Sequence, residues 1–180
     1  MELKELTEKV LNLMNVKTTS ELPEKLFEVV KNGDERIYDG FCEIIGNNLS
    51  VDWMQMIFQY YEADRKEKMQ DYTPKNLADF MGLLVGESEC IIDMCAGSGA
   101  LTIQKWNRNH NLRFLLYEYD EKVIPFLLFN MAVRNILCRV NHADVLQDKI
   151  FHAYTIKKGE RYGILKEESN EHSTIIKSAI

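Results

Sequence analysis

The chain has 180 residues, and with 46% hydrophobic and 28% charged residues it has the composition of an ordinary soluble globular protein. A chain of this length forms about one domain, or a small domain with an appendage, which excludes most multidomain machines. Its 22 Lys and Arg residues against 28 Asp and Glu residues give a net charge of −6. We therefore do not expect a broadly basic surface, and any contact with DNA should be local or shared with a partner.

The first 70 residues carry apolar side chains spaced three or four positions apart, a pattern that predicts amphipathic helices. Such helices are expected over roughly residues 2–15, 21–32, 37–45 and from 52 onward. Ser20 is a plausible N-cap of the second helix, and Gly33 offers a left-handed stop at its end. The sequence thus predicts an N-terminal helical bundle over residues 1–70, closed by the charge-rich stretch 62–71.

Residues 71–180 follow a different pattern, which predicts a second domain. Thr73 is expected to cap a helix with Pro74 at its first position and Gly86 at its end. Next come predicted strands at 89–93, 111–118 and 137–141, with helices at 100–109 and 121–135 between them. This alternation predicts a parallel sheet with right-handed crossovers, and residues 153–165 predict a β-hairpin. The expected fold class is α/β, a helical bundle followed by a truncated Rossmann-like sheet and a C-terminal hairpin.

The octet DMCAGSGA, residues 93–100, joins the first predicted strand to its helix and is the most informative segment. A strand that ends in Asp93 and turns through Gly97 and Gly99 exposes backbone N–H groups and lets a small ligand approach the main chain. A dinucleotide site requires a third glycine, where this chain has Thr102, and Asp93 would repel a pyrophosphate. The pattern therefore favours S-adenosylmethionine, whose methionine end is positively charged, over NAD; alternatively, the glycines form only a tight turn.

Two further acids stand at the ends of the other predicted strands. Glu118 ends the second strand, where a carboxylate can accept hydrogen bonds from both ribose hydroxyls. Asp144 lies just past the third strand, where a carboxylate can receive the adenine amino group. Ligands of open parallel sheets bind at the carboxyl ends of the strands, the edge that also holds Asp93.

The segments DYTP (71–74), IIDMCAGSGALT, LLYEYD, FNMAVRNI and HADVL follow one another in the order found in a known family. Over roughly residues 70–146 the chain resembles the cofactor half of the N6-adenine-specific DNA methyltransferases, similar to the modification subunits of type I restriction-modification systems. The preceding helices are also similar to the N-terminal helical region of those subunits. The resemblance implies S-adenosylmethionine as cofactor, with contacts from Tyr72, Thr73, Pro74, Asp93, Cys95, Ala96, Gly97, Gly99, Glu118 and Asp144.

The sequence departs from that family at the catalytic element, an Asn-Pro-Pro-aromatic motif that holds the flipped adenine. The three prolines stand at positions 23, 74 and 125, so no two are adjacent, and the catalytic residues stay unassigned. In the region where the motif is expected, Tyr162 of the hairpin could serve as a stacking platform, although an exposed aromatic is the commoner case. The alternative to an active enzyme is a non-catalytic cofactor-binding subunit or truncated remnant that needs a partner chain for the base-binding half.

The predicted sheet and the glycine turn leave other partners and functions open. A shortened sheet leaves its first strand with an open edge, which the hairpin or another chain, in a homo- or hetero-oligomer, could cover. An NAD-linked oxidoreductase and a pure protein-interaction module are the remaining alternatives. Nucleophilic catalysis by Cys95 is disfavoured because no base is evident nearby.

Cysteine and histidine spacing indicates neither a disulfide framework nor a metal site. Cys42, Cys90, Cys95 and Cys138 never stand two residues apart, and the four histidines are scattered, so we expect surface or loop histidines and no metal. The N-terminus lacks the apolar core of a signal peptide, and no stretch approaches the ~20 apolar residues of a spanning helix. The sequence predicts a cytoplasmic protein without a membrane segment.

Overall fold

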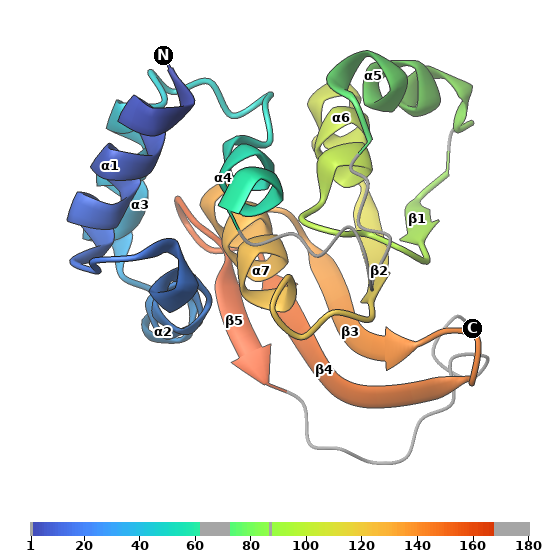
Figure 1. The fold of residues 1–180 in the computed structure, drawn as a ribbon. Coiled ribbons are helices and arrows are strands. Elements are labelled where there is room, and N and C mark those ends of the chain that lie inside the picture. Colours follow the sequence, from blue (N-terminus) through green and yellow to red (C-terminus); the bar gives the residue numbers. More distant parts are fainter. Residues whose placement is uncertain (1, 62–72, 87, 168–180) are drawn as a thin grey trace.

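The computed structural model describes residues 2–61, 73–86 and 88–167, which form an α/β structure (Figure 1). Its helical elements are α1 (Leu3–Met14), the 3-10 turn η1 (Thr19–Glu21), α2 (Leu22–Asn32), α3 (Glu35–Ile44), α4 (Trp53–Tyr61), α5 (Lys75–Leu84), α6 (Ala100–Arg108) and α7 (Ile124–Val133). Its strands are β1 (Cys90–Asp93), β2 (Arg113–Glu118), β3 (Cys138–Asp144), β4 (Lys149–Lys157) and β5 (Ile164–Glu167). The chain therefore alternates helix and strand from β1 to β3, as the sequence predicts.

The described strands form one mixed sheet in the order β1-β2-β3-β4-β5. The first three are parallel, whereas β4 and β5 are antiparallel to their neighbours. The hairpin of β4 and β5 joins the sheet at β3, so the idea that it covers the edge of β1 is wrong. Within the described residues β1 pairs only with β2. The hairpin goes to β3 because a short connection from β3 to β4 favours antiparallel neighbours.

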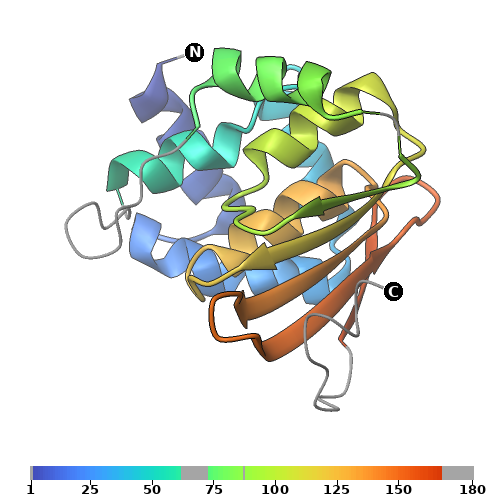
Figure 2. The same ribbon diagram turned by 90° about the vertical axis from the view of Figure 1, so that its right-hand side faces the viewer.

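The helices gather on one face of the sheet (Figures 1 and 2). Right-handed crossovers that step in one direction, from β1 to β2 to β3, carry α6 and α7 to the same side. Because side chains of a strand alternate, Ile91, Leu116 and Val140 point to this side and join the main hydrophobic cluster. Leu115 and Tyr117 point to the opposite side, where a smaller cluster forms.

Helix α7 lies at the centre of the main cluster, and all ten of its residues are buried. Phe129 of α7 contacts Tyr38 and Phe41 of α3, with ring centroids 5.5 Å and 5.1 Å away. Phe126 packs edge-on against Phe58 of α4 at 5.1 Å. The N-terminal helices and the sheet thus share one core. The proposed boundary at residue 70 lies outside the described residues, so the division into two domains stays a prediction.

Local capping differs from the sequence-based expectation at two helix starts. Thr18, rather than Ser20, forms a capping box with Glu21 before α2. Pro74 keeps an extended ψ of 145° and stands at the N-cap of α5 without a side-chain cap, so Thr73 is not the cap. A proline can hold this position because it needs no hydrogen-bond partner for its nitrogen.

The third strand is longer than its apolar run predicts. β3 continues to Asp144, which pairs with Lys149 of β4. The antiparallel neighbour supplies hydrogen-bond partners for the polar end of β3, and these partners are not evident from the strand's own sequence.

The length and composition of the described helices can be compared with those of a membrane-spanning helix. No helix in the described part of the chain has both the length and the apolar composition needed to cross a membrane.

A substitution at Phe129 tests whether the N-terminal helices and the sheet share one core. We expect Phe129→Ala to lower the free energy of unfolding by about 3–5 kcal/mol, because it leaves a cavity between α7 and α3. Leu83→Ala, at a side chain that is 63% exposed, should have little effect. Urea unfolding followed by circular dichroism measures both, and a single transition for each would agree with one cooperative core, whereas two separate transitions in the parent chain would contradict it.

Candidate functional site

The three acids predicted to form a site are the last residues of three neighbouring parallel strands: Asp93 ends β1, Glu118 ends β2 and Asp144 ends β3. All three belong to the positions of their strands that point to the helix-covered face. The register pairs Asp93 with Leu116 and Glu118 with His142, so each acid lies two residues, about 7 Å, beyond the previous one. The acids thus form a diagonal row along one edge of the sheet.

The glycine turn between β1 and α6 is held by β2. Gly97 and Gly99 have positive φ angles of 56° and 102°, in the region of backbone conformation that favours glycine. The Ala96 N–H donates to the Tyr117 carbonyl at 2.9 Å. The turn therefore continues the contact between β1 and β2 beyond the end of β1.

Glu118 braces this turn with its side chain. Its Oε2 accepts the Gly97 N–H at 2.8 Å, and its Oε1 accepts the Asp120 N–H at 2.7 Å. The sequence predicts that the glycine turn exposes backbone N–H groups, but the N–H of Gly97 is used by the strand-end acid instead. Each carboxylate oxygen can accept a further hydrogen bond, so both atoms retain capacity for a ligand donor.

Burial shifts the titration of the groups around the turn. Burial raises the pKa of Asp93 and that of Glu118, although backbone N–H donors counteract the shift in both. The pKa of the Cys95 thiol is raised by burial and by the neighbouring charges of Glu118 and Asp93. A raised pKa keeps the thiol protonated, which argues against Cys95 as a nucleophile.

Asp144 shapes the turn that follows β3. Its Oδ1 accepts the N–H groups of Leu146 and Gln147, both at 3.0 Å. Asp144 therefore fixes this turn as Glu118 fixes the glycine turn, and both acids stay at the edge of the sheet.

A pocket of about 380 Å³ lies between α4 and the starts of α5 and α6. Thr73 and Pro74 line it on one side and Ala100, the first residue after the glycine turn, lines it too. Gln55 of α4 also lines the pocket, and its amide approaches the Thr73 carbonyl at 3.5 Å. The predicted site residue Tyr72 lies outside the described residues.

A buried polar network, which sequence analysis misses, lies behind the glycine turn. It consists of Asp52, Ser98, Asn130 and Arg134, which are at most 6% exposed. Burial raises the pKa of Asp52 and lowers that of Arg134 to about 10. One feature of the sequence points to this network: Asn130 is the single polar residue in the helix IPFLLFNMAV.

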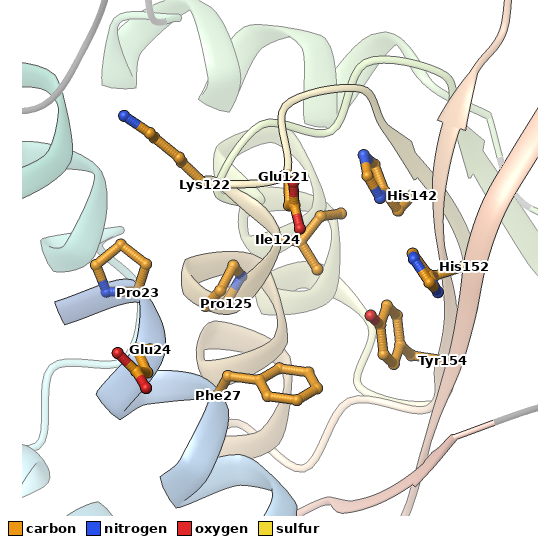
Figure 3. Close-up of a pocket in the computed structure, with 10 residues that line it drawn as sticks. All are labelled: Pro23, Glu24, Phe27, Glu121, Lys122, Ile124, Pro125, His142, His152 and Tyr154. Atoms are coloured by element: carbon orange, nitrogen blue, oxygen red, sulfur yellow. The ribbon is translucent and has the colours of Figure 1, made fainter. Parts of the chain in front are cut away.

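A second pocket, of about 320 Å³, lies on the helix-covered face between α2, the start of α7 and strands β3 and β4 (Figure 3). His142 and His152 face each other on neighbouring strands with ring centroids 5.8 Å apart, so these two histidines lie together rather than scattered, and His152 is exposed, as expected for a surface residue. His142 also contacts the Tyr119 carbonyl at 3.1 Å, and burial lowers its pKa. Residues 2–61, 73–86 and 88–167 hold no group of three or more His, Cys, Asp or Glu residues that could bind a metal ion.

Tyr162 of the hairpin is half-buried rather than exposed, and its contacts are within the protein. Its hydroxyl donates to Asp39 at 2.6 Å, and its ring contacts Tyr38 at a centroid distance of 4.9 Å. The turn between β4 and β5 thus packs against α3.

The structure is an α/β chain with acids at the ends of three parallel strands and a glycine turn after the first strand. These features are typical of proteins that bind a nucleotide-containing cofactor at the carboxyl ends of their strands. In the comparison with protein families, residues 49–163 match the N-6 DNA methylase family. The match covers more than half of the chain, which therefore belongs to this family. It confirms the resemblance to adenine DNA methyltransferases and extends it from residues 70–146 to α4 on one side and to β4 and the turn after it on the other. No curated protein and no solved structure matches the chain.

Gly99 tests the geometry of the turn. A Cβ atom there would lie 2.8 Å from Cε of Met131 and 3.1 Å from Cδ1 of Leu127, at a φ of 102°. At Gly33, with a φ of 61°, a Cβ would meet nothing within 4 Å. We expect Gly99→Ala to lower the free energy of unfolding by about 1–3 kcal/mol more than Gly33→Ala, because only the former adds overpacking to backbone strain. Equal losses in urea unfolding would show that α7 does not confine the turn.

A substitution at Glu118 tests whether burial raises the pKa of its carboxyl group. Because burial raises its pKa in the folded chain, Glu118 stabilises the fold most at pH values below its ordinary pKa, and this contribution is lost as the pH rises through the raised value. Relative to the parent, Glu118→Gln should therefore gain in free energy of unfolding as the pH rises from the ordinary pKa of a glutamate, about 4, through the raised pKa of Glu118. Glu89→Gln, at a side chain that is 94% exposed, removes the same charge without relieving burial. A Glu118→Gln difference that is constant with pH would contradict a buried, ionising carboxylate.

Proposed function

We propose that this chain binds S-adenosylmethionine along the row of strand-end acids and serves N6-adenine methylation of DNA. The observation that carries the proposal is the placement of Asp93, Glu118 and Asp144 at three successive strand ends on one face, in a chain of the N-6 DNA methylase family. We further propose that β1, β2 and β3 are the core of a Rossmann-like sheet and that the preceding helices form a bundle on it.

The chemistry of the row fits the cofactor. Apart from the carboxylate of its methionine end, S-adenosylmethionine presents a sulfonium, an ammonium, two ribose hydroxyls and an adenine amino group, which are cations or hydrogen-bond donors. Three carboxylates offer acceptors and negative charge in return, whereas they would repel the pyrophosphate of NAD. Glu118 would accept the ribose hydroxyls with the capacity left on its two oxygens, and Asp144 the adenine amino group.

The methionine end of the cofactor would lie near the pocket between α4, α5 and α6. Thr73 and Pro74, which the resemblance assigns to that end, line this pocket together with Ala100. Cys95 and Ala96 would contribute main-chain contacts rather than chemistry, because the Cys95 thiol is held protonated.

The chain's own part in the reaction is binding and orientation. When bound, the cofactor supplies a methyl group on a positively charged sulfur. Asp93, Glu118 and Asp144 would hold the bound cofactor in one orientation at the strand ends. Positioning of this kind accelerates transfer to an adenine amine only when a second element holds the base.

A second candidate function is cofactor binding without transfer. It is favoured by the sequence, in which no two prolines are adjacent and the Asn-Pro-Pro motif is therefore missing from these 180 residues. In that case a partner chain supplies the base-binding half and the contact with DNA, and the β1 edge is a place where it could add a strand. A cytoplasmic location and a role in restriction-modification belong to the same proposal.

Calorimetric titration with S-adenosylmethionine tests the binding site. We expect Asp93→Ala and Glu118→Ala each to weaken binding about 10- to 100-fold, the factor for losing charge-assisted hydrogen bonds of about 1.5–3 kcal/mol. Glu89→Ala, at an exposed acid outside the row, should bind like the parent. For the parent, affinity should fall as the pH drops through the raised pKa of Glu118, because the protonated acid loses its charge.

The same titration and a methyl-transfer assay separate the two candidates. Parent chain that binds S-adenosylmethionine and methylates mixed-sequence DNA is an enzyme by itself. Binding without transfer supports the partner-dependent function. A parent chain that does not bind, or acid variants that bind as well as the parent, would overturn the proposed site.

A further inference from the structure

The glycine turn is tied to the N-terminal helices by one side chain. Ser98, the residue between Gly97 and Gly99, donates its hydroxyl to Oδ2 of Asp52 at 2.6 Å. Asp52 directly precedes α4, and its Oδ1 accepts the Gln55 N–H at 2.9 Å, as an N-cap does. The bond therefore joins the start of α4 to the middle of the turn, across 46 positions of sequence.

Asn130 of α7 holds the same two residues from the other side. Its Nδ2 donates to Oδ1 of Asp52 at 2.8 Å and to the Ser98 carbonyl at 2.9 Å. Ser98 is thus bound through both its hydroxyl and its backbone oxygen. Because glycine lacks a side chain, neither Gly97 nor Gly99 can anchor the turn in this way.

Arg134 fixes the segment that presents Asp52. Its Nε donates to the Leu49 carbonyl and its Nη2 to the Val51 carbonyl, both at 2.8 Å, while Nη1 donates to Oδ1 of Asn130 at 2.9 Å. Asn130 therefore bridges the buried guanidinium and the buried carboxylate, donating to one and accepting from the other. The opposite charges compensate each other through the amide, which lowers the cost of burying both.

We propose that Asp52 is a positioning residue for the cofactor site, holding the glycine turn through Ser98 so that the N-terminal helices are an obligatory part of that site. The inference rests on the proposed function, because it concerns the same turn. It goes beyond that function by assigning a role to residues outside the row of acids. Of these residues, Asp52 also lines the pocket proposed for the methionine end, whereas Ser98 and Asn130 do not.

A positioning role differs from a general contribution to stability in where its loss is felt. If Asp52 positions the turn, removing the Ser98 bond loosens the amides of the turn and leaves distant amides unchanged. If Asp52 only stabilises the fold, all amides that exchange by global unfolding are affected equally.

Amide hydrogen exchange measures this difference without any ligand. The reporters in the turn are the N–H groups of Ala96, Gly97 and Gly99, which donate to Tyr117, Glu118 and Ala96. The distant reporter is the Gly163 N–H, which donates to the Ala132 carbonyl at 2.8 Å. We expect Ser98→Ala and Asp52→Asn to speed exchange at the turn about tenfold, which corresponds to about 1.4 kcal/mol, with no change at Gly163.

Thr102→Val is the matched control. Thr102 lies in α6, is 2% exposed, and its hydroxyl has no hydrogen-bond partner among the described residues. This variant removes a buried hydroxyl close to the turn without breaking a bond, so exchange at the turn and binding of S-adenosylmethionine should both match the parent.

Titration of the same variants with S-adenosylmethionine completes the test. A looser turn together with about tenfold weaker binding in Ser98→Ala and Asp52→Asn supports the inference. Unchanged exchange at the turn, equal acceleration at Gly163, or a looser turn with parental affinity each overturns it. A looser turn in variants of a parent that binds no S-adenosylmethionine refutes the proposed function, while the link from Asp52 to the turn remains.

Discussion

The hydrogen bonds of the buried Asp52 carboxylate are the interactions on which the relative placement of α4, α7 and the glycine turn depends. Removing a carboxylate and a guanidinium from water costs several kcal/mol for each ion, a cost that hydrogen bonds and opposite charge must offset. Here Ser98, Asn130 and the Gln55 N–H satisfy the carboxylate, and backbone carbonyls and Asn130 satisfy Arg134. These bonds form only when α4, α7 and the glycine turn adopt one relative position, so the network selects that position over others with similar apolar burial.

The edge of the sheet shows the same principle in the acids. Glu118 connects the glycine turn to the loop before α7, and Asp144 closes the turn after β3. Burial raises the pKa of Asp93 and that of Glu118, so their ionised forms are held at a cost that a cationic or hydrogen-bonding ligand would reduce. Carboxylates with raised pKa values that lie close together are typical of binding sites. Here they lie beside the glycine turn, where Gly97 and Gly99 both have positive φ angles.

Much of the local structure could be predicted because its cause is local. The apolar spacing that predicts a helix at residues 2–15 gives α1, and the stop at Gly33 has the expected left-handed φ of 61°. Predictions failed where a distant segment decides the outcome. The polar end of β3 extends to Asp144 because β4 pairs with it, and Tyr162 is half-buried because α3 lies against the hairpin.

The sequence by itself determined the order of helices and strands, the glycine turn and the acids at the strand ends, because each depends on neighbouring residues and on the alternation of side chains along a strand. The tertiary structure alone decided which groups those residues meet. The Gly97 N–H binds Glu118 rather than facing outward, and Arg134 binds the Leu49 carbonyl 85 positions away. Periodicity indicates which side of an element is buried, but a buried polar atom takes whichever partner the path of the chain brings within hydrogen-bonding distance.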